Sequence, residues 1–441
     1  MANFETLMLV GLIAVLAFGV FFFRKSIALI CWIVSGHIDI GIGGFASAAT
    51  QSPLLNGVKI LGFPSWLMLR FRRNIRAEFK FNVPTLLWSV FIGYATASIV
   101  WAPDRLFDAG VKQIGYFLTY SIGYMVLYAA WRSKSLTLNN IIISILIASV
   151  LAFVQTFVLG NVFGETLNYS RYVSFTSKQQ FGEYLFSSIV FMLFVPKVRM
   201  WLRSSIMLLL WVQLFLNGSR AGVLGAFTAL IIFLLIKGGI KGIIAAILLV
   251  GVSSTAYLAK DTIYDFVEAM GKDNRIYELV EATKNKKGIE TIGTANARLE
   301  FWGATLRHME QWTLTHKIFG KGVSSAGLLV NESYFSRSRG DIVHSDPNRT
   351  MHNELLRVAF EYGWIGLLIF VSFILSLFVY AFKSDITNEA KMMMVAFIPG
   401  FLLFLSMENI FTGSGAAGGI GFMMVISYVH STRLVGKANT N

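Results

Sequence analysis

The stretch GWIGLLIFVSFILSLFVYAF, from Gly363 to Phe382, contains no charged residue and decides the fold class. An α-helix needs about 20 mostly apolar residues to cross the hydrocarbon core of a membrane. Working outward, we find eleven further apolar stretches, near residues 6–23, 26–46, 82–101, 112–131, 139–159, 181–196, 203–217, 221–236, 240–258, 391–409 and 412–431. We therefore predict an all-α integral membrane protein with about twelve transmembrane helices.

The composition supports this class and excludes others. The 441 residues are 55% hydrophobic and 14% charged, whereas soluble globular proteins carry about 25% charged residues. The net charge of +14 would suggest a nucleic-acid partner in a soluble protein, but here it is typical of basic cytoplasmic loops, and we expect no nucleic acid. Cys31 is the only cysteine, which excludes a disulfide framework and a cysteine-built zinc site.

The basic residues predict how the chain is oriented. Short loops rich in Lys and Arg stay in the cytoplasm, and the loop Arg70–Lys80 contains five such residues. Counting spans forward, every second loop is again basic, with Arg132 and Lys134, Lys197, Arg199 and Arg203, Lys237 and Lys241, Lys383 and Lys391, and Arg433 and Lys437. This alternation places the C-terminus in the cytoplasm of a multi-pass inner-membrane protein, while the topology of residues 1–69 stays open.

One long extramembrane segment interrupts the spans. Residues 259–351 lie between the ninth and tenth predicted helices and face the periplasm by the loop count. Their spacing predicts a mostly helical cap, with helices over Ile276–Thr283 and Ala295–Trp312. We thus divide the chain into residues 1–258 with helices 1–9, the cap at 259–351, and residues 352–441 with helices 10–12 and the cytoplasmic C-terminus.

Four outward-facing elements carry residues suited to chemistry. Arg220 begins a span, Arg298 lies in the cap, Arg171 lies in a short loop, and His352 precedes a span. Each has a simpler interpretation: a snorkelling arginine, a helical ion pair, an ordinary loop charge or a structural histidine. Histidine is nonetheless the natural base near neutral pH, with an ordinary pKa near ~6.5, and an intramembrane arginine is costly unless it meets an anion or water.

Several motifs are missing, which narrows the chemistry. The chain has no phosphate-binding loop of the Gly-x-x-x-x-Gly-Lys-Ser/Thr type, no His-Glu-x-x-His and no closely spaced acidic pair. We therefore expect neither a P-loop ATPase nor a carboxylate-held metal, and no cofactor. Arginine forks can neutralise a diphosphate without metal, because each guanidinium bonds two phosphate oxygens at once. The arginines and His352 thus suit a diphosphate substrate in the outer leaflet.

Together these motifs resemble the signature of the O-antigen ligase and O-antigen polymerase family. The resemblance covers most of the chain from about residue 82. It is carried by His352-Asn-Glu-Leu-Leu with Glu-Tyr-Gly363-Trp-Ile-Gly, by Ser-Arg220-Ala-Gly-Val-Leu224-Gly, by Arg298 with Trp302 and Phe319-Gly-Lys-Gly322, and by Leu87-Trp-Ser89 with Trp101 and Asp104.

The resemblance implies a function for each candidate residue. Members of this family transfer a glycan from undecaprenyl diphosphate to a sugar hydroxyl at the periplasmic face, without metal or nucleotide. It implies that Arg220 and Arg298 bind the diphosphate and that His352 orients or deprotonates the acceptor hydroxyl. Arg171 matches a family arginine, although the Asn-rich stretch that usually follows is here Thr176–Gln180. A single displacement would invert the donor linkage.

Three functional hypotheses remain open at this level. The first is a polymerase of O-antigen or exopolysaccharide repeat units, which acts beside a flippase and a chain-length regulator. The second is the ligase that joins the finished polymer to lipid A-core. The third, of another class, is a polysaccharide transporter or flippase, for which twelve spans are equally natural, although the spans carry few ionisable residues at mid-depth. A structural scaffold would not require Arg and His from four elements to meet on one rim.

Overall fold

The computed structural model describes residues 25–35, 62–153, 178–195, 198–217, 219–245, 247–248, 293–327, 351–383, 385–411 and 419–432. Within these ranges every regular element is a helix, as predicted. The helices are α2 (Lys25–Ser35), α4 (Phe63–Glu78), α5 (Val83–Ala97), α6 (Phe107–Arg132), α7 (Leu138–Phe153), α8 (Lys178–Phe194), α9 (Met200–Asn217), α10 (Arg220–Lys237), α14 (Gly293–Glu310), α15 (Leu314–Phe319), α17 (Glu354–Lys383), α18 (Asn388–Met407) and α19 (Ile420–Ser431). Two short 3-10 turns, Ser98–Trp101 and Asp104–Leu106, join α5 to α6.

Over their described residues, the predicted spans from 82–101 to 221–236 and the three that follow the cap each coincide with a helix. Within the described ranges, five helical stretches are long and apolar enough to cross a membrane: Val83–Trp101, Met200–Asn217, Arg220–Lys237, Glu354–Lys383 and Asn388–Met407. The predicted span at 6–23 and more than half of those at 26–46 and 240–258 lie outside the described residues, so the count of twelve stays a prediction. In the cap, α14 matches the expected helix over Ala295–Trp312, whereas Ile276–Thr283 lies outside the described residues.

One local prediction was wrong. The stretch Arg70–Lys80, expected to be a loop, is helical as far as Glu78, because α4 continues through it. Its apolar residues Pro64, Leu67 and Phe71 recur at helical spacing and are buried, mainly against α6. The arginines of this stretch therefore lie on the side of a helix.

The directions of the helices follow from which residues touch. The starts of α8 and α10 meet, because a Cβ on Gly182 would lie 2.5 Å from the Ser219 side chain. The two helices also approach further along, where the rings of Phe194 and Phe233 are 5.1 Å apart, so α8 and α10 run in the same direction. Contacts near the two ends of other helix pairs give their directions in the same way. Helices α6, α17 and α19 run in the same direction as α8 and α10, whereas α5 and α18 run in the opposite direction.

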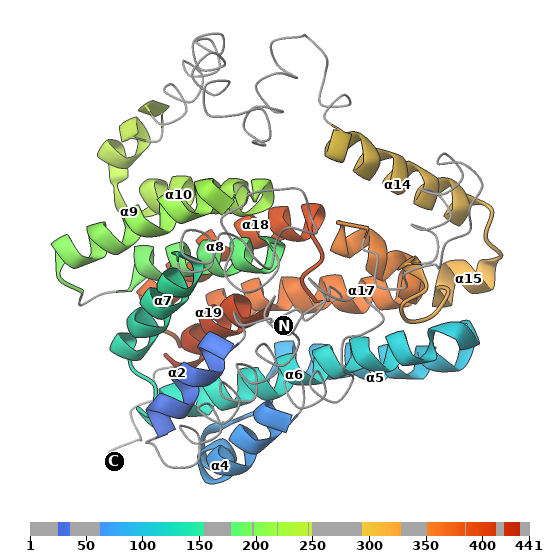
Figure 1. Cartoon of the computed structure of the whole chain (residues 1–441), viewed down its shortest axis with the longest axis horizontal. Coiled ribbons are helices and arrows are strands. Elements are labelled where there is room, and N and C mark those ends of the chain that lie inside the picture. The colour runs from blue at the N-terminus through green and yellow to red at the C-terminus, as the bar shows by residue number, and fades with distance from the viewer. Residues whose placement is uncertain are drawn as a thin grey trace, which may run out of the picture.

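The bundle therefore has two distinct ends. We call "polar end" the one formed by the starts of α6, α8, α10, α17 and α19 and the ends of α5 and α18. The cap helices α14 and α15 lie beside the first turns of α17, at the right of Figure 1. The opposite end, the "basic end", carries Arg132, Lys237 and Lys383. These three residues, each from a loop predicted to be basic, thus lie at one end, as the predicted topology requires.

Aromatic side chains fill the centre of the bundle. Phe91 is fully buried and packs against Trp88, Phe117 and Phe370 with ring centroids 5.3 to 5.6 Å apart. Stacked and tilted ring pairs of this kind each stabilise a fold by about 0.5–1.5 kcal/mol beyond the area they bury. This rigid core holds α5, α6 and α17 together beneath the polar end.

Candidate functional site

Three ionisable side chains from distant parts of the sequence meet at the polar end. Arg298 Nη2 donates to Glu408 Oε1 over 2.8 Å, and His352 Nδ1 lies 2.8 Å from Glu408 Oε2. Arg298 Nη1 also donates to the carbonyl oxygen of Met407, at 3.1 Å. One carboxylate thus holds two of the residues predicted from the sequence, and we take this Arg298–Glu408–His352 cluster as the candidate site.

Each member of the cluster is positioned by a helix or by a residue next to one. Arg298 lies on α14, His352 lies two residues before α17, and Glu408 follows the last residue of α18. Next to His352, the side chain of Asn353 accepts a hydrogen bond from Leu356 N at 2.9 Å, which caps the start of α17. His352 itself adopts a left-handed backbone conformation, with φ of 52°. That conformation is uncommon for a residue with a side chain, and histidine is among those that tolerate it better than most.

The cap is attached directly beside His352. Trp302 Nε1, on α14, donates to the Met351 carbonyl oxygen at 2.9 Å. Met351 is fully buried with Trp312 and Phe360 in a small apolar cluster that joins the cap to α17. Because this contact and the Arg298–Glu408 pair lie one helical turn apart on α14, the helix is fixed against both α17 and α18.

The electrostatics of the cluster favour an ionised Glu408. Burial by itself would raise the pKa of the Glu408 carboxyl, but the hydrogen bond with His352 and the charge of Arg298 outweigh burial and leave the pKa below its usual range. An ionised carboxylate only accepts hydrogen bonds, so the proton between the two side chains belongs to His352 Nδ1. The neutral imidazole then carries a free lone pair on Nε2, which is the atom able to accept a proton.

A second carboxylate fixes the chain that carries Glu408. Glu354 is fully buried at the start of α17, and its Oε2 accepts hydrogen bonds from Ile410 N at 2.7 Å and Phe411 N at 3.2 Å. These donors lie two and three residues after Glu408. Glu354 therefore ties the end of α18 to the start of α17, and the separation of Glu408 from His352 depends on it.

Below the cluster, a buried polar network joins α6, α17 and the cap. Arg357 Nε donates to Glu361 Oε1 at 2.8 Å, and Arg357 Nη2 donates to Gln113 Oε1 at 3.1 Å. Gln113 Nε2 donates to Glu361 Oε2 at 2.8 Å, and Ser324 of the cap donates to Gln113 Oε1 at 2.8 Å. The Arg357 and Glu361 side chains are only 3% and 0% exposed, so each charge depends on the other for its stability.

Two motif glycines explain how the cap reaches this depth. Gly363 interrupts α17 with φ of 62° and ψ of −165°, and Gly320 has φ of 76° and ψ of −173°; this region of backbone space is essentially restricted to glycine. A Cβ on Gly320 would lie 2.4 Å from the Glu361 carbonyl oxygen. The break in α17 frees carbonyl groups, and that of Glu361 accepts from Gly322 N at 2.9 Å. The backbone of the cap thus replaces hydrogen bonds that the broken helix loses.

The structure brings two of the four predicted site residues into contact. Arg220 is the first residue of α10, whose N-cap Ser219 accepts from Gly222 N, so it begins its helix at the polar end as predicted. α10 and α18 cross closely where a Cβ on Gly225 would lie 2.9 Å from the Gly400 carbonyl oxygen. At a helical rise of about 1.5 Å per residue, Arg220 lies about 7.5 Å and Glu408 about 12 Å from that crossing, both toward the polar end. Arg171 lies outside the described residues.

Some functional residues were missed by reading the sequence. In the sequence Glu408 is an ionisable residue near the outer end of a predicted span, and nothing there pairs it with Arg298, 110 residues away. Neither Gln113 nor Arg357 belongs to any of the sequence motifs described above. The only available signal was the cost of burying charges in a span, which predicts that a partner exists without identifying it.

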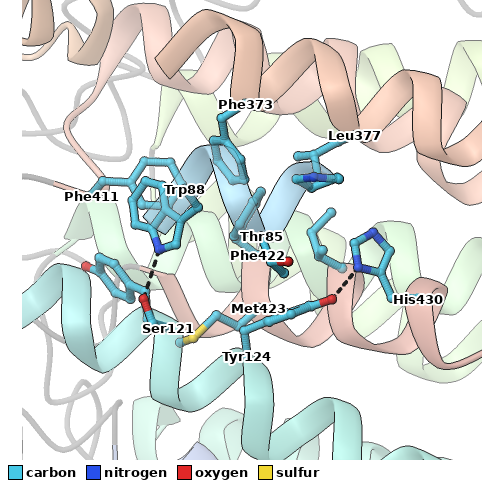
Figure 2. Close-up of a pocket in the computed structure, with 13 residues that line it drawn as sticks. Thr85, Trp88, Ser121, Tyr124, Phe373, Leu377, Phe411, Phe422, Met423 and His430 are labelled. Atoms are coloured by element: carbon cyan, nitrogen blue, oxygen red, sulfur yellow. Dashed lines mark hydrogen bonds between the residues drawn. The ribbon is translucent and has the colours of Figure 1, made fainter. Parts of the chain in front are cut away.

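A cavity at the other end of the bundle contains none of the candidate residues. It has a volume of about 50 Å³ and is lined by 13 residues of α5, α6, α17, α19 and the segment after α18. Figure 2 shows Trp88 donating to Ser121 and Tyr124 in contact with His430 beside it. Most of its lining side chains are apolar, so we assign the site to the Arg298–Glu408–His352 cluster, which carries the reactive groups.

The chemical capacity of the cluster follows from its donors and acceptors. Arg298 uses two of its five N–H groups in the cluster, so three remain for an anionic ligand. The Arg298 and His352 side chains are 19% and 28% exposed, so both can be reached from outside. Within the described ranges no three His, Cys, Asp or Glu side chains gather as a metal site. The arrangement offers a base, an orienting carboxylate and a cation.

Comparison with known proteins agrees with the motifs. Residues 205–371 match the family model described as O-antigen ligase, and this segment, somewhat over a third of the chain, contains Arg220, Arg298, His352 and Gly363. The match confirms the family resemblance seen in the sequence. Glu408 lies beyond it. No curated protein matches the chain.

Proposed function

We propose that the protein is a glycosyltransferase of the periplasmic membrane face. Residues 205–371 match the family model described as O-antigen ligase. That family indicates ligase or polymerase-type activity in a membrane-embedded protein. The protein transfers a glycan from undecaprenyl diphosphate to a sugar hydroxyl, as the polymerase of O-antigen or exopolysaccharide repeat units. The acceptor is the glycan of a second lipid-linked unit.

The proposed reaction is a single displacement. The acceptor hydroxyl oxygen attacks the anomeric carbon of the donor sugar, and the bond from that carbon to the diphosphate oxygen breaks with inversion. The hydroxyl proton passes to Nε2 of His352, and the electron pair leaves with undecaprenyl diphosphate. Arg220 and Arg298, with Arg171 as a third candidate, stabilise the charge that develops on the leaving group, so neither metal nor cofactor is required.

The observation that carries the proposal is the contact of both His352 and Arg298 with Glu408. A carboxylate that accepts from Nδ1–H fixes the tautomer of the neutral ring, so that the lone pair lies on Nε2, and it holds the ring in one orientation, which is how a histidine base is prepared for proton transfer. With Arg298 on the other oxygen of the same carboxylate, one group holds both the base and the cation. A substrate bound beside that carboxylate would contact both.

A transporter is less well supported by the distribution of charge. Within the described residues, the buried Glu and Arg side chains (Glu183, Glu354, Arg357, Glu361 and Glu408) lie within the first eight residues of α8 and α17 or directly after α18. All are toward the polar end, whereas His430 is a buried ionisable side chain at the basic end. A translocation pathway would call for ionisable groups along the depth of the bundle, whereas one-sided charge suits a reaction at one face.

The ligase that joins the polymer to lipid A-core is the second candidate, and the name of the matching family favours it. The surface glycans of a deletion strain separate the two functions. Lipid A-core that carries single repeat units would support the polymerase, whereas loss of all polymer from lipid A with free polymer remaining would support the ligase. A strain that accumulates lipid-linked repeat units in the cytoplasmic leaflet would support a flippase and contradict both.

The diphosphate clamp predicts a particular pattern of substitutions. If Arg220 and Arg298 each bond two phosphate oxygens, replacement by lysine should fail nearly as badly as replacement by alanine, since lysine offers a point charge. Turnover by the purified protein should also persist in EDTA. Full turnover of both lysine variants, or loss with chelator that a divalent ion restores, would contradict the clamp.

The periplasmic placement of the polar end is tested by cysteine labelling. In a Cys31→Ser background, Gln311→Cys on the exposed cap and Lys383→Cys at the basic end are matched positions. A membrane-impermeant reagent that reaches the periplasm should label position 311 in cells, and position 383 only after lysis. The reverse pattern would refute the topology together with the proposed face of the reaction.

A further inference from the structure

Helix α4 is distinct from the other helices of the basic end. Its sequence FPSWLMLRFRRNIRAE has an apolar first half that ends in Arg70 and three further arginines in the second half. It does not belong to the stretches long and apolar enough to span a membrane. The Glu78–Arg132 ion pair, at 3.1 Å, holds its end against the end of α6, and Figure 1 shows α4 at the margin of the bundle. It therefore lies at the basic end, away from the candidate site.

The two faces of α4 differ sharply. Leu67 and Phe71 are fully buried against the bundle, whereas Leu69 is 67% exposed. Arg72, Arg73 and Arg76 are exposed as well. At 100° per residue these four residues share an arc of about 100° on the outward side of the helix. An exposed leucine flanked by three arginines is thus presented to whatever surrounds the basic end.

Within the described part of the chain, no ion pair joins Arg72, Arg73 or Arg76 to an acidic side chain. Glu78 is the only acidic residue of α4, and its carboxylate pairs with Arg132. The positive-inside rule requires only that basic residues lie near the end of a span. It does not require them to share a helix face with an exposed apolar residue. That combination is the pattern of an interfacial helix, whose apolar residue enters the acyl boundary while the arginines reach the phosphates.

We propose that the outward face of α4 (Leu69, Arg72, Arg73 and Arg76) is a docking surface for anionic phospholipid headgroups of the leaflet at the basic end. The guanidinium forks match phosphate oxygens, and a basic residue at an anionic membrane surface changes binding by about fivefold. Trp66 lies under the Arg70 guanidinium, 5.2 Å from its ring centroid, and tryptophan is enriched at the same interfacial depth. This inference is independent of the proposed transferase function.

The test uses the full-length protein in detergent micelles titrated with phosphatidylglycerol or phosphatidylcholine, with thermal unfolding as the readout. Phosphatidylglycerol should raise the unfolding temperature of the wild type. The variant Arg72→Gln/Arg73→Gln/Arg76→Gln should need on the order of 100-fold more of it for the same rise. The matched control Lys237→Gln/Lys241→Gln/Lys383→Gln removes the same charge from exposed positions of the same end and should lose clearly less than the arginine variant, because lysine lacks the planar fork that bonds two phosphate oxygens.

Further arms separate specific docking from general charge effects. The variant Arg72→Lys/Arg73→Lys/Arg76→Lys keeps the charge but loses the fork, and should fall between wild type and the glutamine variant. The proposal would be overturned if the Lys237→Gln/Lys241→Gln/Lys383→Gln control lost as much sensitivity to phosphatidylglycerol as the arginine-to-glutamine variant. It would also be overturned if that arginine variant lost no sensitivity. An equal rise produced by inorganic phosphate without lipid would overturn it too, because the site would then recognise a free anion. All variants should unfold at the wild-type temperature in phosphatidylcholine, since every replaced side chain is exposed.

Discussion

Replacing Glu408 by glutamine tests the centre of the site with the smallest change of shape. The carboxylate accepts hydrogen bonds from Arg298 and His352, both at 2.8 Å. A glutamine amide can accept one of them with its oxygen, but its NH2 group then faces the second donor. The substitution therefore removes one charge and one hydrogen bond and brings two donors together.

The magnitude follows from burial and bond type. A hydrogen bond to a charged group contributes about 1.5–3 kcal/mol, and removing one partner of a fully buried ion pair costs about 3–5 kcal/mol. Because Arg298 and His352 remain 19% and 28% exposed, water can solvate the orphaned donor. We expect the free energy of unfolding to fall by about 1.5–3 kcal/mol, the loss of one bond. Turnover should fall more, by roughly 10²–10⁴, because the base loses its orientation.

The assay compares purified wild type, Glu408→Gln and the control Glu389→Gln, which changes an acidic residue in the first turn of α18 at the basic end. Polymer formation from lipid-linked repeat units and thermal unfolding are both measured. Wild-type turnover by Glu408→Gln would refute the orienting role. An equal loss in Glu389→Gln would show that the effect comes from α18 as a whole.

The depressed pKa of Glu408 adds a pH dependence to the same comparison. A carboxyl whose pKa is lowered by folding stabilises the protein fully above its ordinary pKa of about 4.3 and loses that contribution as the pH falls through the lower value in the folded state. Wild-type stability should therefore fall with acidification below about pH 4, and the glutamine variant should lose less over that range. Identical pH curves would contradict the assigned ionisation.

Three further predictions concern the supports of the site. Gly363→Ala should lower the free energy of unfolding by about 3 kcal/mol, because alanine does not tolerate the backbone conformation at this position. Gly93→Ala is the control: a Cβ there would meet open space, so the substitution should be neutral or slightly stabilising. Thermal unfolding of both variants measures the difference. Arg357→Met should cost about 3–5 kcal/mol because Glu361 is left as a buried charge, and adding Glu361→Met should restore most of it in a double-mutant cycle. Burial and a neighbouring lysine lower the pKa of His316, so the unfolded chain binds more protons and stability should fall from about pH 7 to pH 5, less so in His316→Gln.

The sequence determined the class of fold and the chemistry of two site residues. An apolar run as long as Gly363–Phe382 directly indicates a helix in lipid. Such a helix forms its own backbone hydrogen bonds, so only its side chains contact the surrounding lipid. His352 stood out because polar residues at the rim of such runs are costly without a purpose, and Arg298 stood out through the motif that it forms with Trp302 in the cap. The glycines at 320 and 363 were visible as motifs, although their backbone conformations were not.

Only the tertiary structure decided how these residues combine. Glu408 is 56 residues from His352 and 110 from Arg298 in the sequence, and helical periodicity contains no information about which helix ends meet. The same holds for Gln113, which joins Arg357 and Glu361 from a helix more than 240 residues away. Local pattern reports whether a side chain faces lipid or protein, whereas the pairing of buried charges depends on long-range packing. That packing makes one carboxylate the common partner of the base and the cation.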